Sequence, residues 1–195
     1  MTSTPTPASK DTLSELLISA ASNGDLDEMQ SCVSAGADVN CSDTMWTPLQ
    51  RATWHEHLNA VKWLVEHKAN LDQTTATYHC PLAFACSNGG NIDIMSFLLL
   101  SKADPNTTHP DYRSTPLMCA ALTACRYRKP ALVQLLLEHK ADRTCKDNKG
   151  QTALDIAFET QKGRETSETD LIVGMLATAE PPVAPPAPMP FASIG

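Results

Sequence analysis

Two small histidine and cysteine patterns are the parts of this 195-residue chain whose spacing invites a chemical interpretation. His55-Glu56-His57 places two imidazoles around a carboxylate, and the pairs Cys80/Cys86 and Cys119/Cys125 repeat one spacing. A helical zinc-protease site needs histidines four positions apart, and structural zinc sites separate paired cysteines by about two to four residues. Neither pattern matches, so we predict no metal and no cofactor, and we interpret the cysteines as small core residues. A nucleophilic cysteine–histidine pair stays open, but no third residue that would orient it is evident.

Charge and hydropathy exclude several other classes of function. The chain has 15 basic and 22 acidic residues and a net charge of −7, which argues against nucleic acid and anionic membrane surfaces as partners. No run approaches the roughly 18 apolar residues that a membrane span requires, and Met1 to Lys10 contains no signal peptide. Seven scattered cysteines cannot all pair within one chain and favour a reducing compartment. We expect a cytoplasmic protein, with the nucleus as the alternative.

The elements that must carry any site are announced by two motifs that recur in phase, at intervals of roughly 33 to 37 residues. One motif starts with threonine or cysteine and ends in leucine: Thr47-Pro48-Leu49, Cys80-Pro81-Leu82, Thr115-Pro116-Leu117 and Thr152-Ala153-Leu154. The other contains an alanine followed by aspartate or asparagine: Gly36-Ala37-Asp38, Lys68-Ala69-Asn70, Lys102-Ala103-Asp104 and Lys140-Ala141-Asp142. Such a period indicates stacked supersecondary units.

Each motif has a physical reason. Threonine caps the free N–H groups of a helix and proline tolerates the first helical position, so the first motif starts a helix. A second helix is predicted by the apolar spacing in segments such as Ala60–Val65, Ile94–Leu99 and Leu132–Leu137. The second motif then ends that helix and leads into a projecting turn. Because one helix pair cannot bury its own apolar face, the pairs must stack.

This pattern resembles the ankyrin repeat family over roughly Leu13 to Ala179. The resemblance implies an all-α solenoid of stacked helix-turn-helix units with projecting β-hairpin-like turns. We expect about five repeats, at 13–40, 41–73, 74–107, 108–146 and 147–179, with the first and last acting as caps. Residues 1–12 and the proline- and alanine-rich residues 180–195 are expected to be disordered.

Departures from the family pattern concern the hairpin tips and the turn between the helices. The glycine that usually gives a tip its left-handed residue survives only as Gly150, and His57 occupies the family's turn histidine. The histidine that usually closes the first motif is also missing, so a side-chain link between repeats should be lost. We therefore predict a divergent and less stable array. The tip residues that replace glycine are Met45, Tyr78 and Arg113, and the residues that replace the histidine are Gln50, Ala83, Met118 and Asp155.

The resemblance implies that partners meet the hairpin tips and the exposed ends of the first helices, which line a concave groove. Aromatic residues are only 5% of the chain, yet several of them fall on this surface, where such side chains often dominate binding energy. Alternatively, Met45, Trp46 and Tyr78 pack on adjacent hairpins in place of the missing glycines. The predicted partner-binding residues are Trp46, Trp54, His55, Tyr78, His79, Asn88, Tyr112, Arg113 and Lys149.

Three further features lie outside this surface. Arg126-Tyr127-Arg128-Lys129, within a repeat-four insertion at 124–130, could meet an acidic peptide or a phosphate, but a solvated loop is the default interpretation. Pro182–Pro188 resembles a polyproline ligand without a flanking basic residue, so a flexible tail is favoured. Asn106 occupies a position that some ankyrin proteins present to an asparaginyl hydroxylase.

Together these observations predict a monomeric, non-enzymatic scaffold or adaptor that binds another protein through its groove and hairpin tips. A regulatory or inhibitory subunit of an enzyme, or a substrate-recruiting module, is the alternative. An enzyme is the third class, and the chain lacks the glycine-rich phosphate loop or catalytic motif that this class would need.

Overall fold

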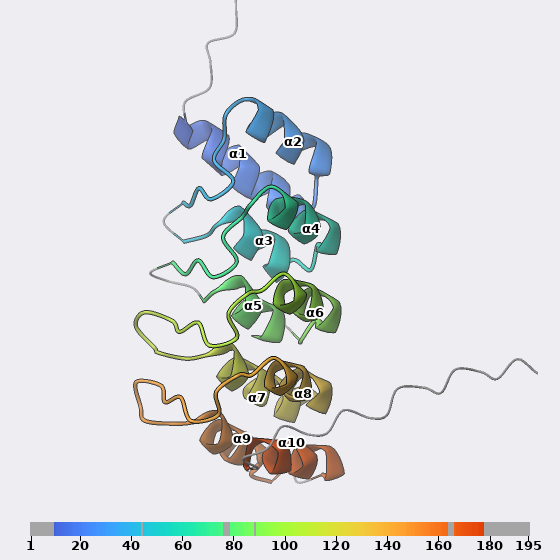
Figure 1. Cartoon of the computed structure of the whole chain (residues 1–195), viewed down its shortest axis with the longest axis vertical. Coiled ribbons are helices and arrows are strands. Elements are labelled where there is room, and N and C mark those ends of the chain that lie inside the picture. Colours follow the sequence, from blue (N-terminus) through green and yellow to red (C-terminus); the bar gives the residue numbers. More distant parts are fainter. Residues whose placement is uncertain (1–9, 44, 76–78, 88, 164–165, 178–195) are drawn as a thin grey trace, which may run out of the picture.

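The computed structural model describes residues 10–43, 45–75, 79–87, 89–163 and 166–177. These residues form helices and connecting turns without a β-strand, which confirms the all-α prediction (Figure 1). The helices of the described part are α1 (Lys10–Asn23), α2 (Leu26–Ser34), α3 (Pro48–Trp54), α4 (Leu58–Glu66), α5 (Pro81–Ser87), α6 (Ile92–Leu100), α7 (Pro116–Tyr127), α8 (Pro130–Glu138), α9 (Ala153–Gln161) and α10 (Ser167–Ala177).

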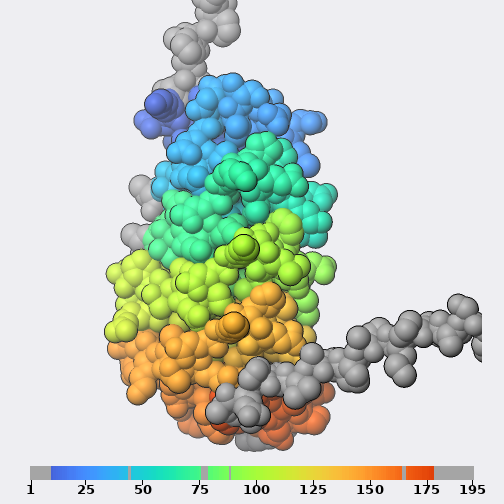
Figure 2. Space-filling model, viewed as in Figure 1, coloured from blue at the N-terminus to red at the C-terminus, as the bar shows by residue number. Residues whose placement is uncertain are grey.

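The helices form two parallel layers. Odd-numbered helices contact the next odd-numbered helix, from α1 to α9, and even-numbered helices do the same from α2 to α10. The connecting hairpins project together from one side of the stack, on the left in Figure 1. In Figure 2 the sequence colours follow one another in bands along the long axis, as expected when each repeat packs on its neighbours.

The threonine motif starts helices as predicted. The side chains of Thr47, Thr115 and Thr152 each accept a hydrogen bond from the backbone N–H three residues further on. The side chain of that residue in turn accepts a hydrogen bond from the threonine N–H. Helix α1 begins at Lys10, so Lys10 to Thr12 belong to the first helix and not to the disordered N-terminus that we expected. Residues 1–9 and 178–195, including the proline-rich tail, lie outside the described residues.

The second motif ends helices α2, α4, α6 and α8 through a left-handed residue. Gly36, Lys68, Lys102 and Lys140 have φ angles of 99°, 69°, 73° and 65°. The alanine that follows each of them donates its N–H back into the last turn of the helix, at 2.9 to 3.0 Å. This arrangement is the Schellman motif, in which glycine is the residue with the least strain. Three of the four repeats use lysine there instead.

A ladder of asparagine and aspartate side chains joins consecutive turns. Asn40 Oδ1 accepts from Asn70 N at 2.6 Å, and Asn106 Oδ1 accepts from Asp142 N at 2.7 Å. The amide nitrogens of both asparagines also donate to backbone carbonyls of the next repeat, at 3.3 and 3.4 Å. Asp72 makes the corresponding bond from Asp104 N at 2.9 Å. The Asn106 carboxamide is therefore a structural link between repeats.

Gln50 shows that one expected loss did not occur. Its Oε1 accepts from Thr47 N at 2.8 Å, while its Nε2 donates to the carbonyl oxygens of Gln73 and His79, at 3.1 and 2.8 Å. Glutamine has an acceptor and a donor on one planar group, so it caps its own helix and links to the next repeat at once. The prediction that replacing the family histidine removes this link was wrong at Gln50.

Candidate functional site

Six aromatic rings form a continuous row across the hairpins and first helices of the second, third and fourth repeats. Its order is Trp54, Trp46, Phe84, His79, His109 and Tyr112, and we call this row the aromatic bar. Successive ring centroids lie 6.0, 5.2, 6.4, 4.7 and 4.8 Å apart, and Trp54 also meets Phe84 edge-on at 5.5 Å. These separations are those of interacting aromatic pairs, so the rings support one another.

The middle of the bar is buried and its two ends are exposed. Trp46 and Phe84 are 5% and 4% exposed and share a small apolar cluster with Ile18. Trp54 and Tyr112 are 36% and 56% exposed. The bar thus presents two large side chains to solvent on a support that is already packed.

Trp46 is the clearest correction to the predicted patch, because its ring is not available on the surface. Its carbonyl oxygen closes the hairpin by accepting from Asp43 N at 3.1 Å, and its side chain turns inward onto Phe84. The Arg51 guanidinium lies 4.3 Å from the Trp46 ring centroid and covers it further. Trp46 is packed, as the alternative expected, but its cluster partners Ile18 and Phe84 lie on helices α1 and α5 and not on adjacent hairpins. The preceding Met45 is exposed.

The other predicted residues divide by burial. Trp54, His55, Tyr112, Arg113 and Lys149 are exposed, and His79 is half-buried beneath Tyr112's hairpin. Burial, with a smaller contribution from His109, lowers the pKa of His79 to about 4. Burial and the nearby Arg51 lower the pKa of His55. Tyr78 and Asn88 lie outside the described residues.

Two residues outside the predicted binding set, Leu122 and His109, also belong to this region. Leu122, on α7, is exposed and occupies the same place in its repeat as Trp54 does. His109 is buried at 1% exposure, and its Nδ1 accepts from Asp111 N and Tyr112 N at 3.1 and 3.3 Å. The sequence signal for Leu122 was the repeat register. For His109 it was the matching position of Asp147 in the next hairpin.

The turn histidine and the basic cluster have structural roles that involve the preceding repeat. His57 Nε2 lies 3.0 Å from Ser22 O. Lys129 Nζ donates to Gly89 O at 2.6 Å and to Gly90 O at 3.4 Å. Lys129 therefore links repeats three and four, while Arg126 and Arg128 remain exposed. Arg128 has a left-handed φ of 56° where α7 ends.

The cysteines of the two repeated pairs lie in or against the hydrophobic core. Cys80, Cys86 and Cys125 are buried, and all seven thiols are free. Burial raises the pKa of the Cys80 thiol to about 12 and raises the pKa values of Cys86 and Cys119 as well. Such thiols stay protonated, which is unsuitable for a nucleophile. Within the described residues, no group of three or more potential metal ligands comes together.

Two adjoining hollows lie between α1 and the first hairpin. The larger, of about 490 Å³, is lined by acidic and serine side chains, and the smaller, of about 300 Å³, includes Ile18 and Arg51. Both share Glu15 and Asp43. Arg51, which lines the smaller hollow, also covers the Trp46 ring.

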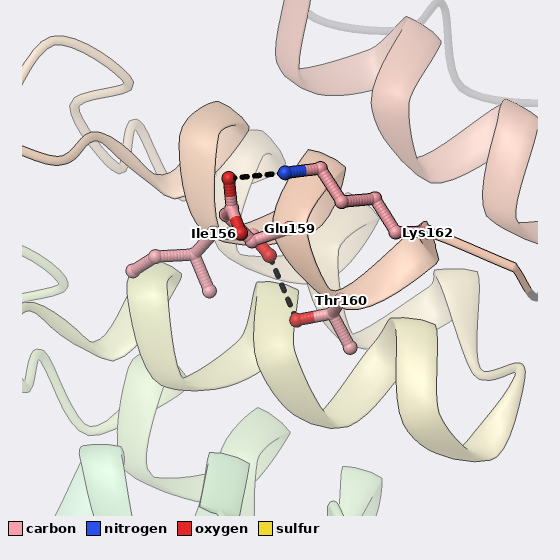
Figure 3. Close-up of polar contacts among 4 residues, drawn as sticks. All are labelled: Ile156, Glu159, Thr160 and Lys162. Atoms are coloured by element: carbon pink, nitrogen blue, oxygen red, sulfur yellow. Dashed lines mark hydrogen bonds and ion pairs between the residues drawn. The ribbon is translucent and has the colours of Figure 1, made fainter.

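The last repeat ends the stack with small local interactions (Figure 3). Lys162 Nζ lies 2.7 Å from Glu159 Oε1, and Thr160 Oγ1 donates to Ile156 O at 2.7 Å. An exposed ion pair of this kind contributes little to stability. The Thr160 hydroxyl is bonded within α9 itself.

Comparisons with known proteins now decide the family. A family model described as "Ankyrin repeats (3 copies)" matches residues 82–168, and one described as "Ankyrin repeats (many copies)" matches residues 17–65. The chain belongs to the ankyrin repeat family. The paired helices and projecting hairpins are thus ankyrin repeats, and the aromatic bar crosses three of them.

Three relatives share parts of this ankyrin array. The ankyrin repeat protein YahD of Escherichia coli K12 is 25% identical over 72% of the chain and 87% of its own length. The ankyrin repeat and KH domain-containing protein mask-1 of Caenorhabditis elegans is 34% identical over 49% of the chain and 4% of its own length. The ankyrin repeat and SOCS box protein 11 of Danio rerio is 31% identical over 58% of the chain and 36% of its own length. The chain thus spans only small parts of the two animal relatives. None of the described helices is long and apolar enough to cross a membrane.

Proposed function

We propose that this ankyrin array is a non-catalytic binding module that holds another protein against the exposed ends of the aromatic bar. The single observation that carries the proposal is the contrast between the buried Trp46 and Phe84 and the exposed Trp54 and Tyr112. Side chains fixed in place before binding lose little conformational entropy when the partner arrives. Tryptophan and tyrosine on such a support have the character of interface hot spots.

The surface around these two rings offers polar contacts from basic side chains. His55 is exposed beside Trp54, and Arg113 and Lys149 are exposed beside Tyr112. Leu122 adds an apolar side chain from α7. A specific interface of about 800 Å² per partner has this composition, with an aromatic and aliphatic centre and a charged rim.

The proposal is tested by affinity purification of the full chain from native extract, followed by quantification of the proteins recovered. Trp54→Ala and Tyr112→Ala should each reduce recovery about tenfold or more, as expected for hot-spot residues. Tyr127→Ala is the matched control, because Tyr127 is 54% exposed but lies at the end of α7 next to the basic cluster. Equal recovery by all three folded variants would exclude the aromatic bar as the binding site.

The same surface would serve a regulatory or inhibitory subunit of an enzyme, or a substrate-recruiting module. The relative from Danio rerio combines ankyrin repeats with a SOCS box by its name, and this combination supports the alternative. The identity of the recovered proteins separates the two. A recurrent enzyme in the Trp54-dependent fraction supports the regulatory module, and a set without enzymes supports the scaffold.

A further inference from the structure

Three ankyrin hairpins are closed by a backbone hydrogen bond whose acceptor is the residue before the threonine cap. They differ in the side chain that accepts hydrogen bonds inside the turn. Asp43 N donates to Trp46 O at 3.1 Å, and Asp43 Oδ1 accepts from two N–H groups of the turn, at 2.6 and 2.5 Å. Asp147 repeats this arrangement in the last hairpin: its N–H donates to Gln151 O at 3.0 Å, and its Oδ1 accepts two bonds, both 2.8 Å. In both hairpins the acceptor is a carboxylate.

The hairpin that carries Tyr112 uses an imidazole in the same place. His109 N donates to Ser114 O at 3.0 Å, which is the closing bond of this hairpin. His109 Nδ1 then accepts from Asp111 N at 3.1 Å and from Tyr112 N at 3.3 Å. His109 Nδ1 thus replaces the aspartate oxygen of the other two hairpins.

This replacement makes the hydrogen bonds depend on the protonation state of His109. A neutral imidazole has one acceptor nitrogen, so a ring whose Nδ1 accepts carries its proton on Nε2. A second proton can only go to Nδ1, which then becomes a donor facing two N–H donors. A carboxylate keeps its acceptor character over the pH range in which histidine changes charge, roughly pH 5 to 8.

We infer that His109 is an acid-sensitive latch: protonation of its ring opens the third hairpin and releases Tyr112 from the aromatic bar, while the Asp43 and Asp147 hairpins stay closed. Its meaning for partner binding rests on the function proposed above, since Tyr112 is one of the two exposed ends of the bar. The latch itself is a property of the free chain.

His109 is enclosed by its own hairpin and by the preceding repeat. The ring is 1% exposed, and its Nε2 has no hydrogen-bond partner among the described residues. Two titratable side chains contact the His109 ring. His79, from the segment before α5, has its ring centroid 4.7 Å away, and Tyr112, from the hairpin itself, has its ring centroid 4.8 Å away. Asp111 supplies its backbone N–H, and its carboxylate forms no ion pair with either ring in the described part of the chain. Burial and His109 lower the pKa of His79 to about 4, so His79 stays neutral between pH 7.5 and about pH 5.

The test is amide hydrogen exchange, resolved by NMR, on the full chain between pH 7.5 and pH 5, with rates corrected for intrinsic pH dependence. Protection of Asp111 and Tyr112 should fall about tenfold or more as the pH is lowered, which is the scale of losing two hydrogen bonds. Protection of Met45, Lys149 and Gln151 should remain constant, because an aspartate holds their turns.

His109→Asn separates the latch from ordinary acid unfolding. The asparagine side-chain oxygen can accept the two turn N–H groups and does not titrate, so protection of Asp111 and Tyr112 should become independent of pH. His109→Phe, which cannot accept, should leave both amides poorly protected at every pH. The inference is overturned if wild-type protection at Asp111 and Tyr112 persists to pH 5, or if His109→Asn shows the same pH dependence as the wild type. Neither outcome involves a partner, so failure here is distinct from failure of the proposed function.

Discussion

Gly89 and Gly90 allow the contact between repeats three and four to be measured with two neighbouring substitutions. Both glycines have left-handed φ angles, of 79° and 72°, in the turn between α5 and α6. A Cβ added at Gly89 would meet nothing within 4 Å. One added at Gly90 would lie 2.7 Å from Leu132 Cδ2 and closer still to Cδ1, and Leu132 is fully buried. The two positions therefore share the backbone strain, and only Gly90 adds a steric clash.

The expected free energies follow from these two terms. A left-handed φ costs an alanine about 1 to 2 kcal/mol, so Gly89→Ala should lower the free energy of unfolding by that amount. Overpacking a rigid core costs a further 1 to 3 kcal/mol or so, so Gly90→Ala should lower it by about 2 to 5 kcal/mol. The difference between the two variants measures how firmly α8 is held against the preceding repeat.

The assay is urea unfolding of the full chain, followed by circular dichroism, with Leu132→Ala as the third arm. In the Leu132→Ala background the clash is removed, and Gly90→Ala should then cost about as much as Gly89→Ala. Equal effects of Gly89→Ala and Gly90→Ala in the wild-type background would refute the tight packing of Leu132 on the turn. An undiminished Gly90→Ala effect without the leucine would refute its assignment to that contact.

The remaining predictions concern links between repeats, each measured by the midpoint of urea unfolding. Gln50→Ala removes the donations to the carbonyl oxygens of Gln73 and of His79, which lies in the next repeat, and should cost about 2 to 3 kcal/mol, whereas Gln50→His should cost under about 1 kcal/mol. Similar losses would refute the bridging role. Asp72→Asn should add about 1 kcal/mol at pH 7, because asparagine gains the second bond that Asn40 makes. Burial raises the pKa of Asp72, so its ionised form destabilises the fold and the gain should shrink as the pH falls. Lys140→Gly should add about 0.5 to 1 kcal/mol by relieving a left-handed φ, and no gain would refute the strain. The pKa of His79 is about 4 in the folded chain and 6.5 in the unfolded chain. The free energy of unfolding of the wild type is therefore highest above pH 6.5 and should fall by about 2 kcal/mol towards pH 4, a value discounted for partial exposure. His79→Phe should reduce this loss of stability at acidic pH.

The fold could be predicted because its determinants are local and repeated. Threonine caps, the proline at the start of a helix and the left-handed residue at its end each act within a few residues, so their spacing reports the helix pairs directly. Prediction was less accurate where different residue types can fill the same structural role. Gln50 keeps a link that the family makes with histidine, and Arg113 adopts a φ of 55° at a tip where glycine is usual.

The candidate site could be predicted by position but not by side-chain direction. Within a hairpin, neighbouring residues face opposite ways, so a register correct to one residue still confuses Trp46, which points inward, with Met45, which is exposed. Burial of Trp46 also depends on Phe84 and Ile18, which come from other repeats. No pattern within one repeat contains that information, whereas Tyr112 and Trp54 could be placed from register alone.

The second and third repeats contribute most of the rings of the aromatic bar. Trp46, Phe84 and His79, from the second and third repeats, pack on one another. A divergent sequence is therefore compatible with packed hairpins, and the lower stability expected of the array stays a prediction. The exposed end at Tyr112 differs from the exposed end at Trp54 in one respect: Trp54 is held by a helix, and Tyr112 is held by a turn whose acceptor is His109. Because the bar spans both, a change in one hairpin alters half of the presented surface and leaves the other half in place.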